Sequence, residues 1–337
     1  MKKNKKKIIL LLITCIFLYF VFVNLDVKEL LNVMKQFNVW YILPLAVSIL
    51  CSLSVRGMVF KQLLHNSIKP PISELAHLCI TTAAMNIVLP ARAGDIFRAF
   101  YVGHKYNTDK VKIFGTVMLE RIFDIVVIFS FLLIGIFIYH KNQTAINLCS
   151  FAGICGIIGF AMVLYAYKYN KTDTICNFLI EKTKKFPLSD FIGKLISFVN
   201  KTDRKFFNGF GVIEHPKYLF TAILSSFGVW FFECLNFYMT MQGFGCEIHW
   251  SVTLFLISFI ALACMVPSTS IFIGPYQMAV IAAFSLYNIG KETALAISIV
   301  EQAVVVISTS IIAVTFMMKN NISYKELKQD IKNSQQV

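Results

Sequence analysis

The sequence predicts an all-α polytopic membrane protein with six full spans and two broken, re-entrant helix pairs, arranged as inverted repeats around a central polar cavity. Hydrophobic residues make up 57% of the 337 positions and charged residues only 15%, which is far more apolar than a soluble domain of this length. Six apolar runs approach the roughly 20 residues that a helix needs to cross a bilayer. The same order of long and short runs occurs twice along the chain.

The six long apolar runs are the predicted spans. The first follows the basic stretch "MKKNKKK", as a secretory signal would, but no small-residue cleavage pattern comes after it. We therefore expect residues 1–38 to be a retained N-terminal anchor and linker. The six runs are 8–25, 39–60, 111–139, 145–167, 218–241 and 293–318.

The basic residues support these spans. If the N-terminus is cytoplasmic, all but five of the 32 Lys and Arg residues lie on or near the cytoplasmic side, as the positive-inside rule requires. Both termini are then cytoplasmic, in the plasma membrane of a bacterium or archaeon. Because these charges flank spans instead of forming one basic module, we expect no nucleic-acid partner. The five exceptions are Lys28, Lys35, Lys141 and Lys291, which lie outside, and Arg121 within a span.

Two stretches of the chain repeat the same order of parts, residues 39–139 and 218–318. Lys110 precedes Glu120 by the same spacing that separates Lys291 from Glu301. Asn107 and Asn288 also match. Between the repeats, residues 140–217 hold a span and a basic cytoplasmic segment, which anionic headgroups would attract, although topology alone also explains its charge. A cytoplasmic tail at 319–337 completes this single membrane domain.

Each repeat contains a short apolar run that ends at a proline, Pro90 or Pro267. As a helix, such a run reaches only about 22 to 24 Å, less than the roughly 30 Å hydrocarbon core. A broken pair that enters and leaves by one face explains both the length and the break, although ordinary proline kinks are the alternative. Opposite entry faces would make the repeats inverted, as in many transporters. The pairs span 72–103 and 251–288, with short runs at 75–89 and 251–266 and second helices at 96–103 and 276–287.

The first break, within "NIVLPARAGDIFRAF", has the composition of an anion site. A helix that begins near Gly94 points free N–H groups and a partial positive charge at the cavity. Arg92 and Arg98 add full charges with a planar fork suited to phosphate, and Asp95 can pair with either arginine. We expect a lipid headgroup to bind here, at Asn86, Arg92, Gly94, Asp95 and Arg98.

The second break, within "VPSTSIFIGPYQMAV", offers hydroxyls instead of arginines. Pro275 suits the first turn of a helix. A change from a cationic cytoplasmic site to a neutral outer one would let an anionic headgroup bind and then leave. The residues expected at this turn are Pro267, Ser268, Thr269, Ser270, Gly274 and Gln277.

Several charges lie within the spans, where each costs a few kcal/mol and usually marks a pathway or a paired network. Glu120 and Asp124 share one helix face at i, i+4, and Arg121 can reach Asp124 at i, i+3. One arginine among several carboxylates leaves negative charge that the loop arginines or a proton could balance. A salt-bridge network that only fixes helix packing is the alternative, and for Arg56, near the end of a span, the structural role is favoured. The expected polar route consists of Glu120, Arg121, Asp124, Glu233 and Glu301.

The sequence gives no sign of a metal site, a cofactor or a catalytic group. The nine cysteines include no CxxC pair, and the six histidines lack HExxH-like spacing.

The string "NIVLPARAGDIFRAF" followed by "VMLERIFDIVVI" resembles the membrane domain of the lysylphosphatidylglycerol synthase/flippase family, from about residue 40 to 317. The family pattern runs N-x-x-L-P-x-R-x-G-[DE]-x-x-R and then L-E-R-x-x-D. In the second half, Gln277 stands where members usually have an acid. The matching positions are Asn86, Leu89, Pro90, Arg92, Gly94, Asp95, Arg98, Glu120, Arg121 and Asp124.

The resemblance implies a domain that moves aminoacylated phosphatidylglycerol, or a related anionic or polyprenyl-linked lipid, between leaflets. Full-length members continue into a soluble aminoacyl-transferase domain, and the short tail here has no room for one. We therefore expect a translocator rather than an enzyme, with membrane phospholipids as its partners. Two alternatives remain: a membrane-bound transferase with Asp95 or Glu120 as general base, and a non-transporting partner of a separately encoded lipid-modifying enzyme.

Overall fold

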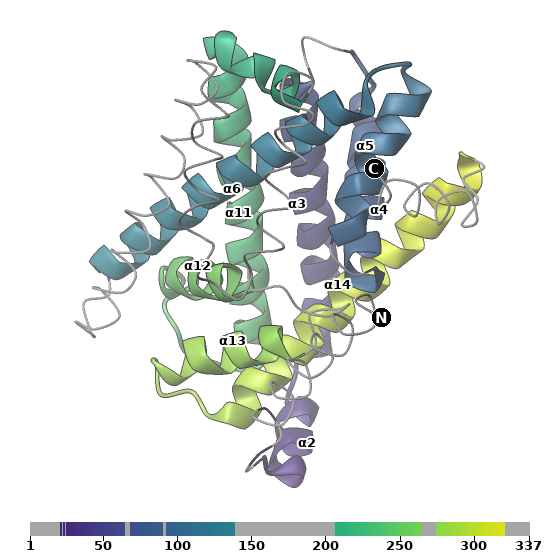
Figure 1. Cartoon of the computed structure of the whole chain (residues 1–337). Coiled ribbons are helices and arrows are strands. Elements are labelled where there is room, and N and C mark those ends of the chain that lie inside the picture. The colour runs from purple at the N-terminus through teal and green to yellow at the C-terminus, as the bar shows by residue number, and fades with distance from the viewer. Residues whose placement is uncertain are drawn as a thin grey trace, which may run out of the picture.

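A computed structural model describes Val21, Val23 and residues 25–64, 68–89, 92–138, 206–264 and 274–320. The expected span at 145–167, most of that at 8–25, and Pro90, Pro267, Ser268, Thr269 and Ser270 lie outside these residues. Every regular element in the described ranges is a helix (Figure 1). They are α2 (Val27–Lys35), η1 (Val39–Tyr41), α3 (Ile42–Leu63), α4 (Ile72–Val88), α5 (Ala93–Lys105), α6 (Lys110–Ile138), η3 (Asn208–Glu214), α11 (Pro216–Gly243), α12 (Val252–Ala263), α13 (Pro275–Ser285) and α14 (Lys291–Lys319).

Four of these helices are long and apolar enough to cross a membrane. They confirm the spans expected at 39–60, 111–139, 218–241 and 293–318. Two further helices arise where the sequence predicted only a linker and a basic segment. Asp26 caps α2 by accepting the N–H groups of Lys28 and Glu29, and η3 packs on α6 where Gly209 meets Gly115.

The long helices α3 and α11 pack side by side along most of their length, in opposite directions (Figure 1). Small residues line the contact: Ser52 donates a hydrogen bond to the Val229 carbonyl at 3.4 Å, and Gly228 lies against Val55. Helix α6 crosses this pair obliquely. The middle of α6 is therefore brought close to both α3 and α5.

Helices α4 and α5 form the first broken pair. Helix α4 ends at Val88, Leu89 is extended, and Arg92 adopts a left-handed conformation with φ of 54° before α5 begins. The absence of a side chain at Gly94 lets α5 pack closely against α4, because a Cβ there would lie 2.4 Å from the Thr82 carbonyl oxygen of α4. The predicted break in the first apolar run is confirmed.

A polar cluster joins the start of α4 to the end of α5. Glu74 pairs with Lys105 at 2.8 Å and accepts a hydrogen bond from the Tyr106 hydroxyl at 3.0 Å. Burial and this hydrogen bond raise the pKa of Tyr106 to about 12, so the phenol keeps its proton and remains a donor.

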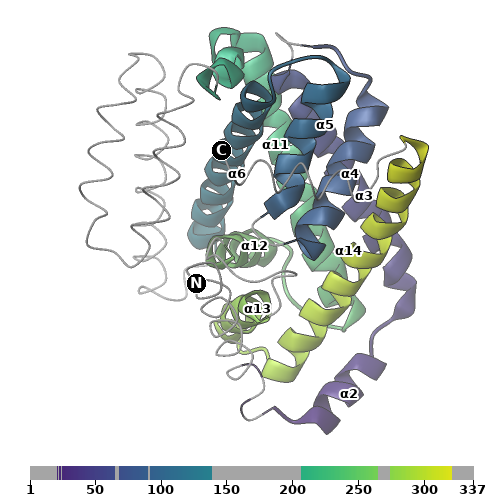
Figure 2. The same cartoon turned by 45° about the vertical axis from the view of Figure 1, so that its right-hand side comes forward.

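The second broken pair, α12 and α13, has a different orientation from the first. Both helices lie across the long axes of α3 and α11 in Figure 1, and α12 is seen nearly end-on in Figure 2. Residues 252–258 of α12 are all buried, as expected of a helix that is apolar on every side. Gly135 allows α6 to approach the backbone of α12 at Phe255 closely. Helix α12 is thus a buried helix that packs against α6, whereas α4 packs mainly against α3 and α14.

The two repeats share one turn in detail. Asn107 and Asn288 have φ of 47° and 58°, the left-handed conformation that asparagine tolerates best after glycine. Each donates its N–H to the residue three positions earlier, and the next residue donates to the carbonyl five positions before it. The matched asparagines therefore end α5 and α13 in the same way.

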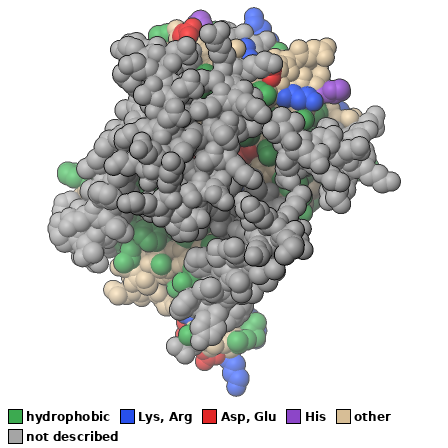
Figure 3. Space-filling view, in the orientation of Figure 1, with side chains coloured by type: hydrophobic (Ala, Val, Ile, Leu, Met, Phe, Trp, Pro, Cys, Tyr) green, Lys and Arg blue, Asp and Glu red, His purple; other side chains and the backbone are tan. Residues whose placement is uncertain are grey.

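Charged side chains that are visible in the space-filling view lie mostly at the two ends of the molecule (Figure 3). The upper end carries the start of α6, and the lower end carries α2. Lys28 and Lys35 on α2 and Lys291 at the start of α14 were all expected on one side of the membrane. Their helices meet at the lower end, where the Asp26 N–H lies 3.4 Å from Glu292.

Candidate functional site

Three arginines and three carboxylates meet where α3, α5 and α6 come together. Helix α6 presents Glu120 and Asp124 on one face, as the sequence predicted from their spacing. Arg56 of α3 reaches both of them through one nitrogen, at 3.1 Å from Glu120 and 2.8 Å from Asp124. Both carboxylates are buried. We call this group of six charged residues the charged network; its members are Arg56, Asp95, Arg98, Glu120, Arg121 and Asp124.

Helix α5 adds Arg98, which is completely buried. Its guanidinium lies 2.9 Å from Glu120 and 4.4 Å from the centre of the Phe60 ring, and it also contacts the Cys79 sulfur at 3.3 Å. Ring and carboxylate together stabilise a cation that has no access to water. Two nitrogens of Arg98, Nε and Nη2, have no hydrogen-bond partner in the described part of the chain.

Arg121 closes the charged network. It pairs with Asp124 at 2.8 Å, as predicted from their spacing on the helix, and with Asp95 of α5 at 3.2 Å. Asp95 also lies 3.9 Å from Arg98. The network therefore contains equal numbers of positive and negative groups. The negative excess expected from the sequence is balanced by Arg98 and by Arg56.

Sequence reasoning missed Arg56, because it placed this residue near the end of a span with a structural role. A signal was available, since Arg56 is the only charged residue in the apolar run 39–60. Trp230 was missed as well: its indole N–H donates to Asp124 at 2.9 Å. Asn86, which was predicted, donates to Asp95 at 3.3 Å. Trp230 thus satisfies the Asp124 oxygen that the arginines leave free, whereas Asn86 donates to the same Asp95 oxygen as Arg121.

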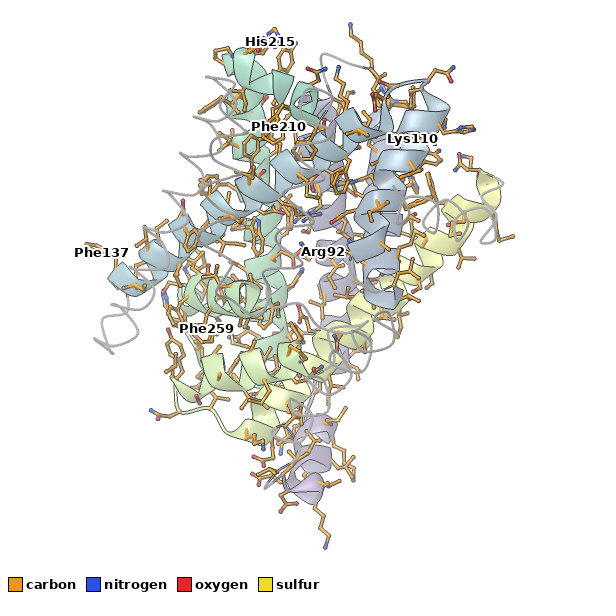
Figure 4. The ribbon with its side chains drawn as sticks, in the orientation of Figure 1. Arg92, Lys110, Phe137, Phe210, His215 and Phe259 are labelled. Carbon is orange, nitrogen blue, oxygen red and sulfur yellow. The ribbon has the colours of Figure 1, made fainter. Side chains whose placement is uncertain are left out.

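Arg92 lies at the start of α5, near the centre of the molecule (Figure 4), next to the charged network, since Arg121 and Asp95 both act on its charge. Its side chain is exposed, and the structure records no ion pair between it and any described residue. The backbone of Arg92 is in the left-handed region, which is strained for a residue other than glycine. Strained residues of this kind are often found at functional sites. At Gly94 the absence of a side chain lets α4 approach closely.

The second half has a neutral counterpart of this arrangement. Gly274 precedes α13 with φ of 97°, just as Arg92 precedes α5 with a positive φ, and Pro275 occupies the first turn as predicted. The Gly274 N–H donates to the Gln277 side chain at 2.7 Å. The hydroxyl of Tyr276 donates to Glu301 on α14.

The two halves also match in one contact between a short and a long helix. Asp95 and Gln277 are each the third residue of their short helices, and each contacts the residue that follows the repeated glutamate. In the first half this contact is the ion pair of Asp95 with Arg121. In the second it is a hydrogen bond of 2.8 Å from Gln277 to Gln302. An amide pair thus takes the place of an ion pair.

Glu233 and Glu301 are not members of the charged network. Glu233 on α11 accepts a hydrogen bond of 2.7 Å from Ser52 of α3, and Glu301 is bonded to Tyr276. The structure therefore divides the expected polar route into two groups of different charge.

Comparison with known proteins identifies a relative and a family. The protein named Glycosyltransferase AglD, from Haloferax volcanii, is 27% identical over 119 residues, which are 35% of this chain and 19% of that protein. The chain thus spans about a fifth of the length of this curated relative. No solved structure matches the chain. The family model described as the lysylphosphatidylglycerol synthase TM region matches residues 7–313, and the chain belongs to this family.

Proposed function

We propose that the protein is a lipid translocator, which moves an anionic or aminoacylated phospholipid, or a polyprenyl-linked lipid, between leaflets. The family and the four apolar helices make it a multi-pass membrane protein with a lipid-related role. The observation that carries the proposal is the unpaired, exposed Arg92 at the N-terminus of α5, beside a charged network that is already neutral. A cation with no partner at this depth calls for an anionic ligand.

In this proposal the headgroup phosphate binds Arg92 and the free N–H groups in the first turn of α5. Arg98 then offers the unsatisfied Nε and Nη2 as inner contacts when a headgroup enters. The charged network keeps α5 and α6 in register around the phosphate, and the acyl chains stay in the bilayer. The neutral turn at Gly274 and Gln277 serves as the weaker site at which the headgroup leaves.

The finer architecture also belongs to the proposal. Six spans, two inverted repeats and a central polar cavity would place Arg92 at the cavity wall. The shared asparagine turns and the paired contacts of Asp95 and Gln277 support the repeat. Helix α2 and the start of α14, which the sequence assigns to one side of the membrane, meet at the lower end, which would be extracytoplasmic with both termini in the cytoplasm.

Replacing Arg92 with alanine is expected to slow lipid transfer more than tenfold. A hydrogen bond to a charged group contributes about 1.5–3 kcal/mol, and about 1.4 kcal/mol corresponds to a factor of ten. Folding should be unchanged, because Arg92 forms no ion pair with a described residue. The left-handed backbone at this position is equally strained for alanine. The measurement is leaflet transfer of a fluorescent anionic phospholipid in reconstituted vesicles. Lys28→Ala, an exposed change on α2, is the control, and equal transfer by both variants contradicts the proposal.

A transferase activity is the second candidate, because the curated relative is named a glycosyltransferase. Asp95 and Glu120, the expected general bases, both form ion pairs with arginines, and these contacts leave neither carboxylate free to take a substrate proton. We expect purified protein, incubated with activated donors and lipid acceptors, to give no covalent product by mass spectrometry. A lipid product that disappears in Asp95→Asn protein would establish the transferase instead.

A further inference from the structure

Two carboxylates in the membrane helices have no positive partner among the described residues. Glu301 on α14 is 7% exposed and is hydrogen-bonded by Tyr276, and Glu233 on α11 is hydrogen-bonded by Ser52. Glu120, which occupies the repeat position of Glu301, instead lies within 4 Å of three arginines. The same position in the two halves therefore has two different electrostatic environments.

No described residue places a cation within ion-pair distance of Glu301, although Arg92 acts on the neighbouring Cys264 thiol. Helix α13 contributes the Tyr276 phenol, the end of α12 contributes the Cys264 thiol, and α11 contributes Glu233, which repels a second negative charge. Helix α2 meets α14 at its start, where the Asp26 N–H contacts Glu292. The titratable groups of α4 are remote: Glu74 lies at its start, and His77 stacks on Phe316 at the far end of α14.

On the side of Glu233, the nearest cation is Arg56 of α3. Its guanidinium is already bonded to Glu120 and Asp124, so little of its charge remains for a third carboxylate. If Glu233 and Glu301 were both ionised, burying two unpaired anions in hydrocarbon would cost several kcal/mol of free energy. Binding of a proton to one of the two carboxylates lowers this cost.

Orphaned polar atoms next to Glu233 point to the same ligand. Asn236 lies one turn further along α11 with its amide close to the Glu233 carboxylate, yet neither amide atom has a hydrogen-bond partner in the described part of the chain. The side chain is 1% exposed. Ser48, one turn before Ser52 on α3, has an unsatisfied hydroxyl as well. A carboxylate cannot donate to the Asn236 carbonyl oxygen, but a protonated carboxyl group can.

We propose that Glu233 and Glu301 form a proton-binding pair, separate from the charged network, which holds at least one proton at neutral pH. Ser52 and Tyr276 donate to the carboxyl oxygens, and Asn236 accepts the proton-bearing hydroxyl. Release of the proton leaves two uncompensated anions on α11 and α14, and their repulsion would push these helices apart. Proton binding to this pair would thus change how tightly the helices pack. The proposal does not depend on lipid transport.

Infrared spectroscopy of the purified full chain tests the pair directly. At neutral pH the wild type should show the carbonyl stretch of a protonated carboxyl group, which shifts in deuterated buffer and disappears in alkaline buffer. Glu301→Gln should remove or shift this band, and Glu233→Gln should do the same, because the two groups share the proton. Glu29→Gln, an exposed change on α2, is the control and should leave the band unaltered.

Two results would overturn the proposal. One is a wild-type spectrum without a protonated carboxyl band at neutral pH, which needs no variant to fold; a melting temperature that then rises with sodium concentration at fixed pH would assign the pair to an alkali ion. The other is a band that both glutamine variants retain. None of these readouts involves lipid, so loss of the translocator function would leave the test intact.

Discussion

Replacing Glu120 with leucine is expected to lower the free energy of unfolding by about 3–5 kcal/mol, the usual cost of breaking a buried ion pair from one side. Arg98 is completely buried and lies 2.9 Å from Glu120, while its next carboxylate, Asp95, is 3.9 Å away. Arg56 keeps Asp124, so the loss falls mainly on Arg98. Thermal unfolding of the purified protein in detergent measures the effect.

A compensating pair separates lost charge balance from lost packing. In the double variant Arg98→Met with Glu120→Leu, both buried charges are removed and their volume is kept, so most of the stability should return. Glu29→Leu on the exposed face of α2 is the control for a generic loss of carboxylate. If the double variant is less stable than Glu120→Leu alone, the pair of Arg98 and Glu120 does not act as a unit.

The spans were predictable because one physical quantity fixes them. The thickness of the hydrocarbon sets a helix length, and the apolar run at 111–139 has that length, so α6 agrees with it to within one residue. The break after Val88 was also predictable, because Pro90 lacks the backbone N–H that a helix interior requires. Local spacing also predicted the pair of Arg121 and Asp124.

The meeting of α3, α5 and α6 was not predictable from local pattern. Arg56 belongs to the charged network because α6 crosses α3 obliquely, and a crossing angle depends on residues of both helices. The orientation of α12 depends likewise on Gly135 of α6, far away in the sequence. A short apolar run predicts that a helix is too short to span, but the partner helix determines how it lies.

The neutral charge of the network changes what the site can do. Three arginines matched by three carboxylates hold one another, and a headgroup that displaced one of them would leave a buried charge unpaired. In the proposed translocator, Arg98 is a positioning residue until a headgroup offers an equivalent anion, whereas Arg92, which forms no ion pair with a described residue, would bind from the start. The two arginines that the sequence grouped together therefore have separate roles.

The second large effect is expected at Gly94, where alanine should displace α5 and disable lipid transfer. A Cβ there would lie 2.4 Å from the Thr82 carbonyl oxygen and 2.7 Å from the side-chain oxygen of Asn86, and the first of these atoms belongs to the backbone of α4. Overpacking of this kind costs about 1–3 kcal/mol, and a rigid backbone neighbour favours the upper limit. Because α5 carries both Asp95 and Arg98, its displacement also separates the ion pairs with α6.

Gly228→Ala is the matched control for this prediction. It makes the same change at a half-buried position of another helix, but its Cβ would meet only the Val55 side chain at 3.5 Å, an ordinary contact. We expect Gly228→Ala to keep the wild-type melting temperature and transfer rate. Gly94→Ala should have a lower melting temperature and a lower transfer rate. Asn86→Ala in the Gly94→Ala background should recover little, because the Thr82 backbone remains in place. Wild-type transfer by Gly94→Ala would mean that the packing of α5 against α4 does not position the headgroup site.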